Sequence, residues 1–224
     1  TYVKLNRMDE VRRRLRSFSD AAATEGKFLD WFERLYEHAD SNPVWIPWSK
    51  GEPHPMLVDW MENTNRSPGT ALVVGCGLGE DAMYLAELGW KVTAFDIAPT
   101  AVQWASKRYP HEHINWVVGD LLQPNNEWEK AFDFVLEVHI LQAIPEEFRI
   151  PASRNLSPLV SSSGQLVCIG RLSIDDSIQQ EGPPWPLSEK FISSIGNDLK
   201  SIDFTPVQFE GEETIRYRAV WKNE

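Results

Sequence analysis

The sequence predicts an α/β protein with a doubly wound, mostly parallel seven-stranded sheet, an antiparallel final strand and an N-terminal helical cap. From residue 70 onward, short strand-like segments alternate with helical ones. Each of these strands is an almost continuous apolar run, which is typical of parallel strands that are covered on both faces. The last two strand-like segments are joined by so short a turn that they must run antiparallel.

Each expected element has its own local signal. Large apolar residues recur at three- and four-residue steps over 21–36, which predicts a helix that Ser19 or Asp20 caps. Residues 41–55 are rich in proline and predict a loop, and a short helix follows over 56–61. The expected strands are 71–74, 91–96, 114–118, 132–138, 165–169, 202–209 and 214–221, and the later helices are 81–88, 99–109, 145–156 and 188–199.

We expect one folding unit in two parts. Residues 1–66 would form the N-terminal helices and a cap loop rich in proline and tryptophan, and residues 67–224 a Rossmann-like domain. The 224 residues are long enough to bury a core without a metal or a disulfide.

Charge and cysteine usage narrow the class of protein. The 22 Lys and Arg residues against 33 Asp and Glu residues give a net charge of −11, which argues against a nucleic-acid partner. Cys76 and Cys168 lie inside apolar runs and are expected to be buried thiols of a reducing compartment. No apolar run is long enough to cross a membrane, and residues 1–16 lack the apolar stretch of a signal peptide. We therefore expect a cytoplasmic protein without a membrane partner.

A glycine loop and two acids predict a nucleotide-type ligand. Gly75 and Gly77 follow the first strand and open a helix, so the backbone can turn tightly and present free N–H groups. Asp96 ends the second strand about 20 residues later, where a carboxylate can bind ribose hydroxyls. Gly119 and Asp120 follow the third strand, also at a carboxyl end.

The acids after the glycine loop favour one ligand over another. Glu80 stands where a dinucleotide-binding loop has its third glycine, and Asp81 follows it. Two acids at this helix start would repel a pyrophosphate but suit a ligand that has a cationic amino group and no phosphate. S-adenosylmethionine meets that description, and a nicotinamide-dependent oxidoreductase is kept as an alternative.

These motifs resemble those of a known family. The runs VGCGLGED (74–81) and TAFDIAPTA (93–101), with Gly119 and Asp120, resemble class I S-adenosylmethionine-dependent methyltransferases. The aromatic helix 31–36 and the loop IPWSKGEPHP (46–55) are similar to those of the thiopurine, thiol and halide methyltransferase group. The resemblance implies methyl transfer from S-adenosylmethionine to a small-molecule acceptor, such as a thiol, a halide or another soft nucleophile. A macromolecular acceptor is the alternative.

The same resemblance implies a set of cofactor-binding residues. Gly75 and Gly77 would face the methionine portion, and Asp96 would hold the ribose. Ile97 would pack on adenine and Asp120, with Leu121 beside it, would accept from the adenine amine. Glu137 or Val138 would lie beneath the methyl group. Tyr36 and Trp48 would cover the cofactor from the side of the N-terminal segment.

Candidate residues for the acceptor side come from the later strands and the loops. His139, after the fourth strand, is a candidate base if the acceptor must lose a proton, and a structural role is the alternative. Arg171 ends the fifth strand and could pair with an anionic substrate. Trp45 and Trp185 lie in proline-rich loops and either line the substrate pocket or pack those loops onto the core. The other histidines lack companions at metal-ligand spacing, so we expect no metal site.

Overall fold

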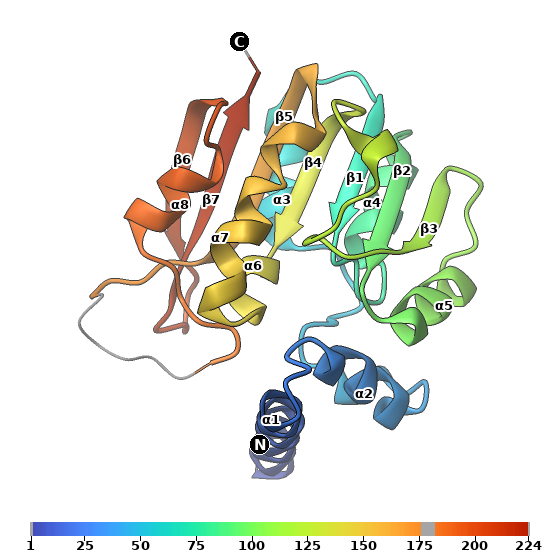
Figure 1. The fold of residues 1–224 in the computed structure, drawn as a ribbon, viewed down its shortest axis with the longest axis vertical. Helices are drawn as coiled ribbons and strands as arrows, with labels where there is room; N and C mark the ends of the chain where they lie inside the picture. The colour runs from blue at the N-terminus through green and yellow to red at the C-terminus, as the bar shows by residue number, and fades with distance from the viewer. Residues whose placement is uncertain (1, 176–181, 224) are drawn as a thin grey trace.

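A single seven-stranded mixed sheet forms the centre of the molecule (Figure 1). The computed structural model describes residues 2–175 and 182–223. The strand order is β3-β2-β1-β4-β5-β7-β6. The strands are β1 (Thr70–Val74), β2 (Lys91–Asp96), β3 (Ile114–Val118), β4 (Phe132–Val138), β5 (Val160–Arg171), β6 (Lys200–Gln208) and β7 (Ile215–Lys222). The α-helices are α1 (Tyr2–Thr24), α2 (Asp30–Ala39), α3 (Pro55–Asn63), α4 (Glu80–Glu87), α5 (Pro99–Arg108), α6 (Ile140–Ala143), α7 (Glu146–Arg154) and α8 (Glu189–Ile195).

The register of the parallel strands brings their carboxyl ends together. Val74 of β1 is paired with Glu137 of β4, and Asp96 of β2 with Val118 of β3. β7 lies between β5 and β6 and runs antiparallel to both, which confirms the predicted antiparallel ending. A ligand at the carboxyl edge can therefore contact β3, β2, β1 and β4 at once.

Helices cover both faces of the sheet, as the apolar strands predict. Residues of α3 and α4 pack on one face, among them Leu57, Ala82 and Leu85, all fully buried. Residues of α6, α7 and α8 pack on the other face, among them Leu141 and Ile192. The continuous apolar character of the strands follows from this double covering.

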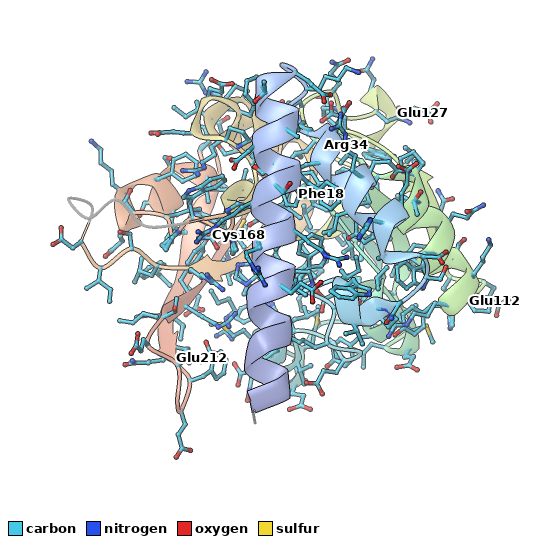
Figure 2. All side chains as sticks on the ribbon, turned by 90° about the horizontal axis from the view of Figure 1, so that it is seen from below. Phe18, Arg34, Glu112, Glu127, Cys168 and Glu212 are labelled. Carbon is cyan, nitrogen blue, oxygen red and sulfur yellow. The ribbon has the colours of Figure 1, made fainter. Side chains whose placement is uncertain are left out.

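The helix expected over 21–36 is wrong, because two helices meet there. α1 extends to Thr24 and α2 begins at Asp30. Between them Gly26 adopts φ 69°, and the Lys27 N–H donates to the Ala22 carbonyl at 2.9 Å, a glycine-based helix ending. Figure 1 shows α1 and α2 below the edge at which the parallel strands end, and Figure 2 shows α1 across that side of the molecule.

A carboxylate attaches the helical cap to the sheet domain. Glu33 of α2 accepts hydrogen bonds from the backbone N–H (3.0 Å) and the hydroxyl (2.5 Å) of Thr100, in the first turn of α5. Around this contact, Trp31 and Leu35 of α2 share an apolar cluster with Ala101 of α5. Because a helix N-terminus favours a negative charge, Glu33 stabilises both the start of α5 and the position of α2.

Several other boundaries differ from the prediction, and the expected helix 188–199 is α8, which ends at Ile195. β5 starts at Val160 rather than at residue 165, and its pairing with β4 shifts register between Phe132 and Phe134. The expected helix 145–156 is α7, which is shorter, and the turn α6 precedes it. Of the helices in the described ranges, none has both the length and the apolar composition needed to cross a membrane.

Candidate active site

A cavity opens at the carboxyl edge of the sheet. The empty space between its walls is about 510 Å³, part of which is open to solvent. Five of the predicted cofactor residues line it. They are Gly75, Asp96, Ile97, Asp120 and Leu121. They come from the ends of β1, β2 and β3, so the cavity spans the three neighbouring strands that the sequence indicated.

Asp96 is buried in the wall of this cavity and oriented by the backbone. One carboxylate oxygen accepts from the Gly77 N–H at 2.9 Å, and the other from the Ala98 N–H at 3.0 Å. Burial raises the pKa of Asp96 to about 6, although these backbone hydrogen bonds oppose the rise. Each oxygen keeps a further lone pair, so the carboxylate can still accept from a vicinal pair of hydroxyls.

The glycine loop needs its glycines for conformation and for space. Gly75 has φ 59° and Gly77 has φ 53°, the left-handed region that other residues rarely adopt. A Cβ on Gly75 would lie 2.2 Å from the Ile140 side chain, and one on Gly77 would lie 3.2 Å from the Tyr36 hydroxyl. Side chains at these positions would therefore displace the groups that surround the loop.

Tyr36 and Trp48 lie against the glycine loop from the N-terminal side. Trp48 donates its indole N–H to the Tyr36 hydroxyl at 2.8 Å. Tyr36 is buried, whereas Trp48 is 40% exposed. Both lie within 3.6 Å of the position that a Cβ on Gly77 would take, so the cap and the loop are in direct contact.

Other residues of the cavity were not predicted from the sequence. They include Leu29 and Phe32 at the start of α2, and Ile140, Ile144 and Ala152 from the α6–α7 segment. The apolar spacing that contains Phe32 did appear in the sequence, but it indicated only a buried helix face. The position of Leu29 and Phe32 at the cavity depends on the break at Gly26, which the sequence analysis did not place.

The acids Glu80 and Asp81 have a structural role that the sequence did not indicate. Glu80 accepts hydrogen bonds from the Ser49 hydroxyl, from the Gly51 N–H (3.3 Å) and from the Arg108 guanidinium (3.0 Å). Asp81 accepts from the His54 N–H at 2.7 Å. Both acids thus attach the proline-rich loop to α4.

Glu137 is not among the residues that line the cavity. Its Oε1 accepts from the N–H groups of Ile140 (2.6 Å) and Leu141 (3.0 Å) at the start of α6. Its Oε2 is buried, and within the described ranges no hydrogen-bond partner is found for it. Cys168 of β5 is the residue that is paired with Glu137 across the two strands. Burial raises the pKa of Glu137 to about 7.

His139 connects β4 to α6 in a left-handed conformation, with φ 62°. Its imidazole lies beside the ring of His54, with 5.8 Å between the ring centroids, and its Nε2 is 3.4 Å from the Arg216 guanidinium on β7. Its Nδ1 is 2.9 Å from the side-chain oxygen of Gln142. Non-glycine residues in such conformations are concentrated at functional sites. Residues at the ends of β4 and β5 and at the start of β7 thus form a second polar group beside the cavity.

Comparison with known proteins identifies the family. The family model of thiopurine S-methyltransferase matches residues 42–203. The chain belongs to this family. It is a methyltransferase, and its methyl donor is S-adenosylmethionine, as predicted, rather than a nicotinamide.

The relatives of this methyltransferase are similar over most of the chain. A probable thiol methyltransferase 2 of Arabidopsis thaliana is 28% identical over 162 residues, which are 70% of each chain. A thiocyanate methyltransferase 1 of Brassica oleracea is 26% identical over 73% of this chain and 71% of its own. The N-methyltransferase NodS of Bradyrhizobium japonicum, solved with S-adenosyl-L-homocysteine, has the same fold, with a TM-score of 0.66 and 19% identity over 85% of this chain and 97% of its own.

The cavity of the methyltransferase fits this cofactor. Its walls are mostly apolar, as an adenine ring requires, and Asp96 would supply acceptors for ribose hydroxyls. The glycine loop leaves backbone groups accessible at the end of β1. Nothing in this set calls for a phosphate, in keeping with a nucleoside that carries an amino acid.

The two tryptophans of the predicted substrate pocket lie in different surroundings in the methyltransferase. The Trp185 N–H donates to the Gln142 carbonyl at 2.8 Å, which places it beside the polar residues around His139. Trp45 packs against the α1–α2 cluster, and the Arg14 guanidinium lies 4.3 Å from the centre of its ring. The cation on Trp45 thus comes from the protein itself, and neither tryptophan lines the cavity.

Proposed function

We propose that this methyltransferase methylates a small molecule with a soft or anionic nucleophile, such as a thiol or a halide, and that it acts in the cytoplasm. The single observation that carries the proposal is the group of basic side chains beside the methyl-donor cavity. Arg171 ends β5, Arg216 lies on β7, and both reach the surroundings of His139. The relatives named for thiol and thiocyanate methylation support the same class of acceptor.

The order of the strands supports a specific arrangement of the cofactor and the acceptor. Asp120 and Leu121 at the end of β3 would hold adenine, with Ile97 packed on it, and Asp96 at the end of β2 would hold the ribose. Gly75 at the end of β1 would face the methionine portion. The next strand is β4, followed by β5 and β7. The acceptor would therefore approach from the side of His139, Arg171 and Arg216.

The protein's part in this reaction is orientation and exclusion of water. S-adenosylmethionine supplies an activated methyl group on a positively charged sulfur when it is bound. Gly77, covered by Tyr36 and Trp48, would hold the methionine portion in place. Arg171 would hold an anionic acceptor in line with the methyl group, so that proximity provides much of the rate enhancement. Glu137 would act indirectly, because its hydrogen bonds fix the start of α6.

An acceptor panel tests the proposal. Purified protein is incubated with S-adenosylmethionine and iodide, thiocyanate, thiophenol, a peptide mixture or an oligonucleotide, and S-adenosylhomocysteine is measured by mass spectrometry. We expect turnover with the small acceptors only. Turnover with the peptides or the oligonucleotide alone would contradict the proposal.

A matched pair of variants tests the basic side chains. Arg171→Gln removes a charged partner of the acceptor, so the KM for thiocyanate should rise about 10- to 100-fold. The affinity for S-adenosylmethionine should remain unchanged. Arg154→Gln, on the exposed end of α7, is the control and should leave the KM unaltered. An unchanged KM in Arg171→Gln would remove Arg171 from the acceptor site.

A further inference from the structure

Gln142 is held in one orientation by the backbone of β5. Its side-chain nitrogen donates to the Arg171 carbonyl at 2.6 Å, and its side-chain oxygen accepts from the Arg171 N–H at 2.7 Å. A backbone N–H can only donate and a carbonyl can only accept. These two hydrogen bonds therefore determine which atom of the amide is oxygen and which is nitrogen. Gln142 is only 1% exposed, so water does not compete for them.

The orientation of Gln142 determines the tautomer of His139. His139 Nδ1 lies 2.9 Å from the same Gln142 oxygen. Because an amide oxygen only accepts, Nδ1 must carry the hydrogen of this bond. In a neutral imidazole the other nitrogen, Nε2, then carries the lone pair, which faces the Arg216 guanidinium in a long contact of 3.4 Å. Burial, together with the positive charges of Arg216 and Arg171, lowers the pKa of His139 to about 4, so the ring is neutral at neutral pH.

The groups around Nε2 suit the removal of a proton from an acidic acceptor. Arg216 lies 3.4 Å from Nε2 and is also paired with Glu212, at 2.9 and 3.1 Å. His54 borders the same space, and burial lowers its pKa to about 3, so it adds no charge at neutral pH. The net charge facing His139 from β5, from β7 and from the turn before β7 is therefore positive. An acceptor that becomes an anion on losing its proton would be stabilised there.

We infer that His139 Nε2 removes the proton of a thiol or an acidic hydroxyl of the acceptor, and that Gln142 is the positioning residue that keeps this lone pair available. The inference rests on the proposed function and makes its acceptor class narrower. Nε2 takes the proton while the acceptor's sulfur or oxygen forms the bond to the methyl carbon, and the electron pair of the broken carbon–sulfur bond stays on the cofactor. The imidazolium then returns its proton to water.

The acidity of the acceptor follows from the weakness of the base. A buried imidazole with a lowered pKa takes protons only from groups that ionise readily. Alkyl alcohols are too weakly acidic for it, whereas aromatic thiols and electron-poor phenols are within its range. A halide has no proton to lose, so its methylation would not use His139 as a base.

Nitrogen NMR tests the tautomer without any acceptor. In ¹⁵N-histidine-labelled protein with S-adenosylhomocysteine, the resonance lost in His139→Ala identifies the ring. We expect the Nδ1–H tautomer in the wild type and in Gln165→Met, which changes a glutamine on β5 away from His139. We expect Gln142→Met to shift the ring toward the Nε2–H form. An Nε2–H tautomer in the wild type, or an unchanged ring in Gln142→Met, would overturn the inference.

Kinetics tests the proton transfer with thiophenol and 4-nitrophenol, one arm for sulfur and one for oxygen. Below the acceptor's own pKa, His139→Ala should lower kcat by about 10²- to 10⁴-fold with at least one of them. The loss should become smaller as the pH rises above that pKa, because the acceptor then arrives already ionised. A loss that is the same at every pH, or no loss, would overturn the inference. Absence of transfer by the wild type to every small acceptor would instead overturn the proposed function.

Discussion

Replacing Glu137 with glutamine should make the folded protein less sensitive to pH. The carboxyl group is 1% exposed, and burial raises its pKa from 4.5 to about 7. A raised pKa means that protonation stabilises the folded state below pH 4.5 and that this stabilisation is lost as the pH rises to about 7. At about 1.36 kcal/mol per pKa unit, the full loss is about 3 kcal/mol, and most of it falls between about pH 5 and pH 8.

Glu137→Gln keeps the oxygen that accepts from Ile140 and Leu141 but cannot ionise. Urea denaturation at about pH 5 and pH 8 should therefore show that the variant loses about 2 to 3 kcal/mol less stability than the wild type over this interval. Glu147→Gln, at an exposed position on α7, should behave as the wild type does. Equal losses in the wild type and in Glu137→Gln would show that the buried carboxyl is not the source of the dependence.

Three further predictions concern the cofactor cavity. Asp96→Ala should weaken S-adenosylmethionine binding by about 1–3 kcal/mol in calorimetry, because the ribose hydroxyls lose their acceptor. Asp198→Ala, at an exposed position in the turn before β6, is the control and should bind normally. Since the pKa of Asp96 is raised to about 6, the affinity of the wild type for S-adenosylmethionine should fall roughly tenfold from about pH 7 to pH 5. Asp96→Asn should lack this fall, and a parallel fall in both proteins would contradict the assignment of Asp96 to the ribose. Gly77→Val should abolish measurable binding, because its Cβ would meet the Tyr36 hydroxyl at 3.2 Å. Gly211→Val, at a glycine that also has a positive φ but nothing within 4 Å, should bind normally, and normal binding by Gly77→Val would show that the loop is only a turn.

The sheet could be predicted because its signals are local. An apolar run bounded by glycine or proline reports a buried strand whatever lies next to it, and the predicted bounds of β2, β3 and β4 are those observed. The cavity residues Gly75, Asp96 and Asp120 could be predicted for the same reason, since each follows or ends such a strand. Once the strands are parallel, their ends must meet at one edge.

The rest of the site depends on contacts between distant segments. Phe32 reaches the cavity only because Gly26 ends α1 and lets α2 turn toward the sheet. The pairing of Gln142 with Arg171 joins residues 29 positions apart and follows no sequence spacing. Nor does the sequence indicate that His139, expected to be either a base or a structural residue, would meet a side chain from β7. Such contacts depend on side-chain packing, which patterns along one chain do not report.

The acids after the glycine loop show how one feature can give a correct prediction for an incomplete reason. Glu80 and Asp81 predicted a cofactor without phosphate, and the cofactor is S-adenosylmethionine. The structure shows that these acids bind Ser49, Gly51 and the backbone of His54, so they hold the cap loop against the domain. Because residues of both parts surround the cavity, a bound cofactor would contact the cap and the sheet at once. Its binding free energy would therefore add to the stability of an association that the two acids already maintain.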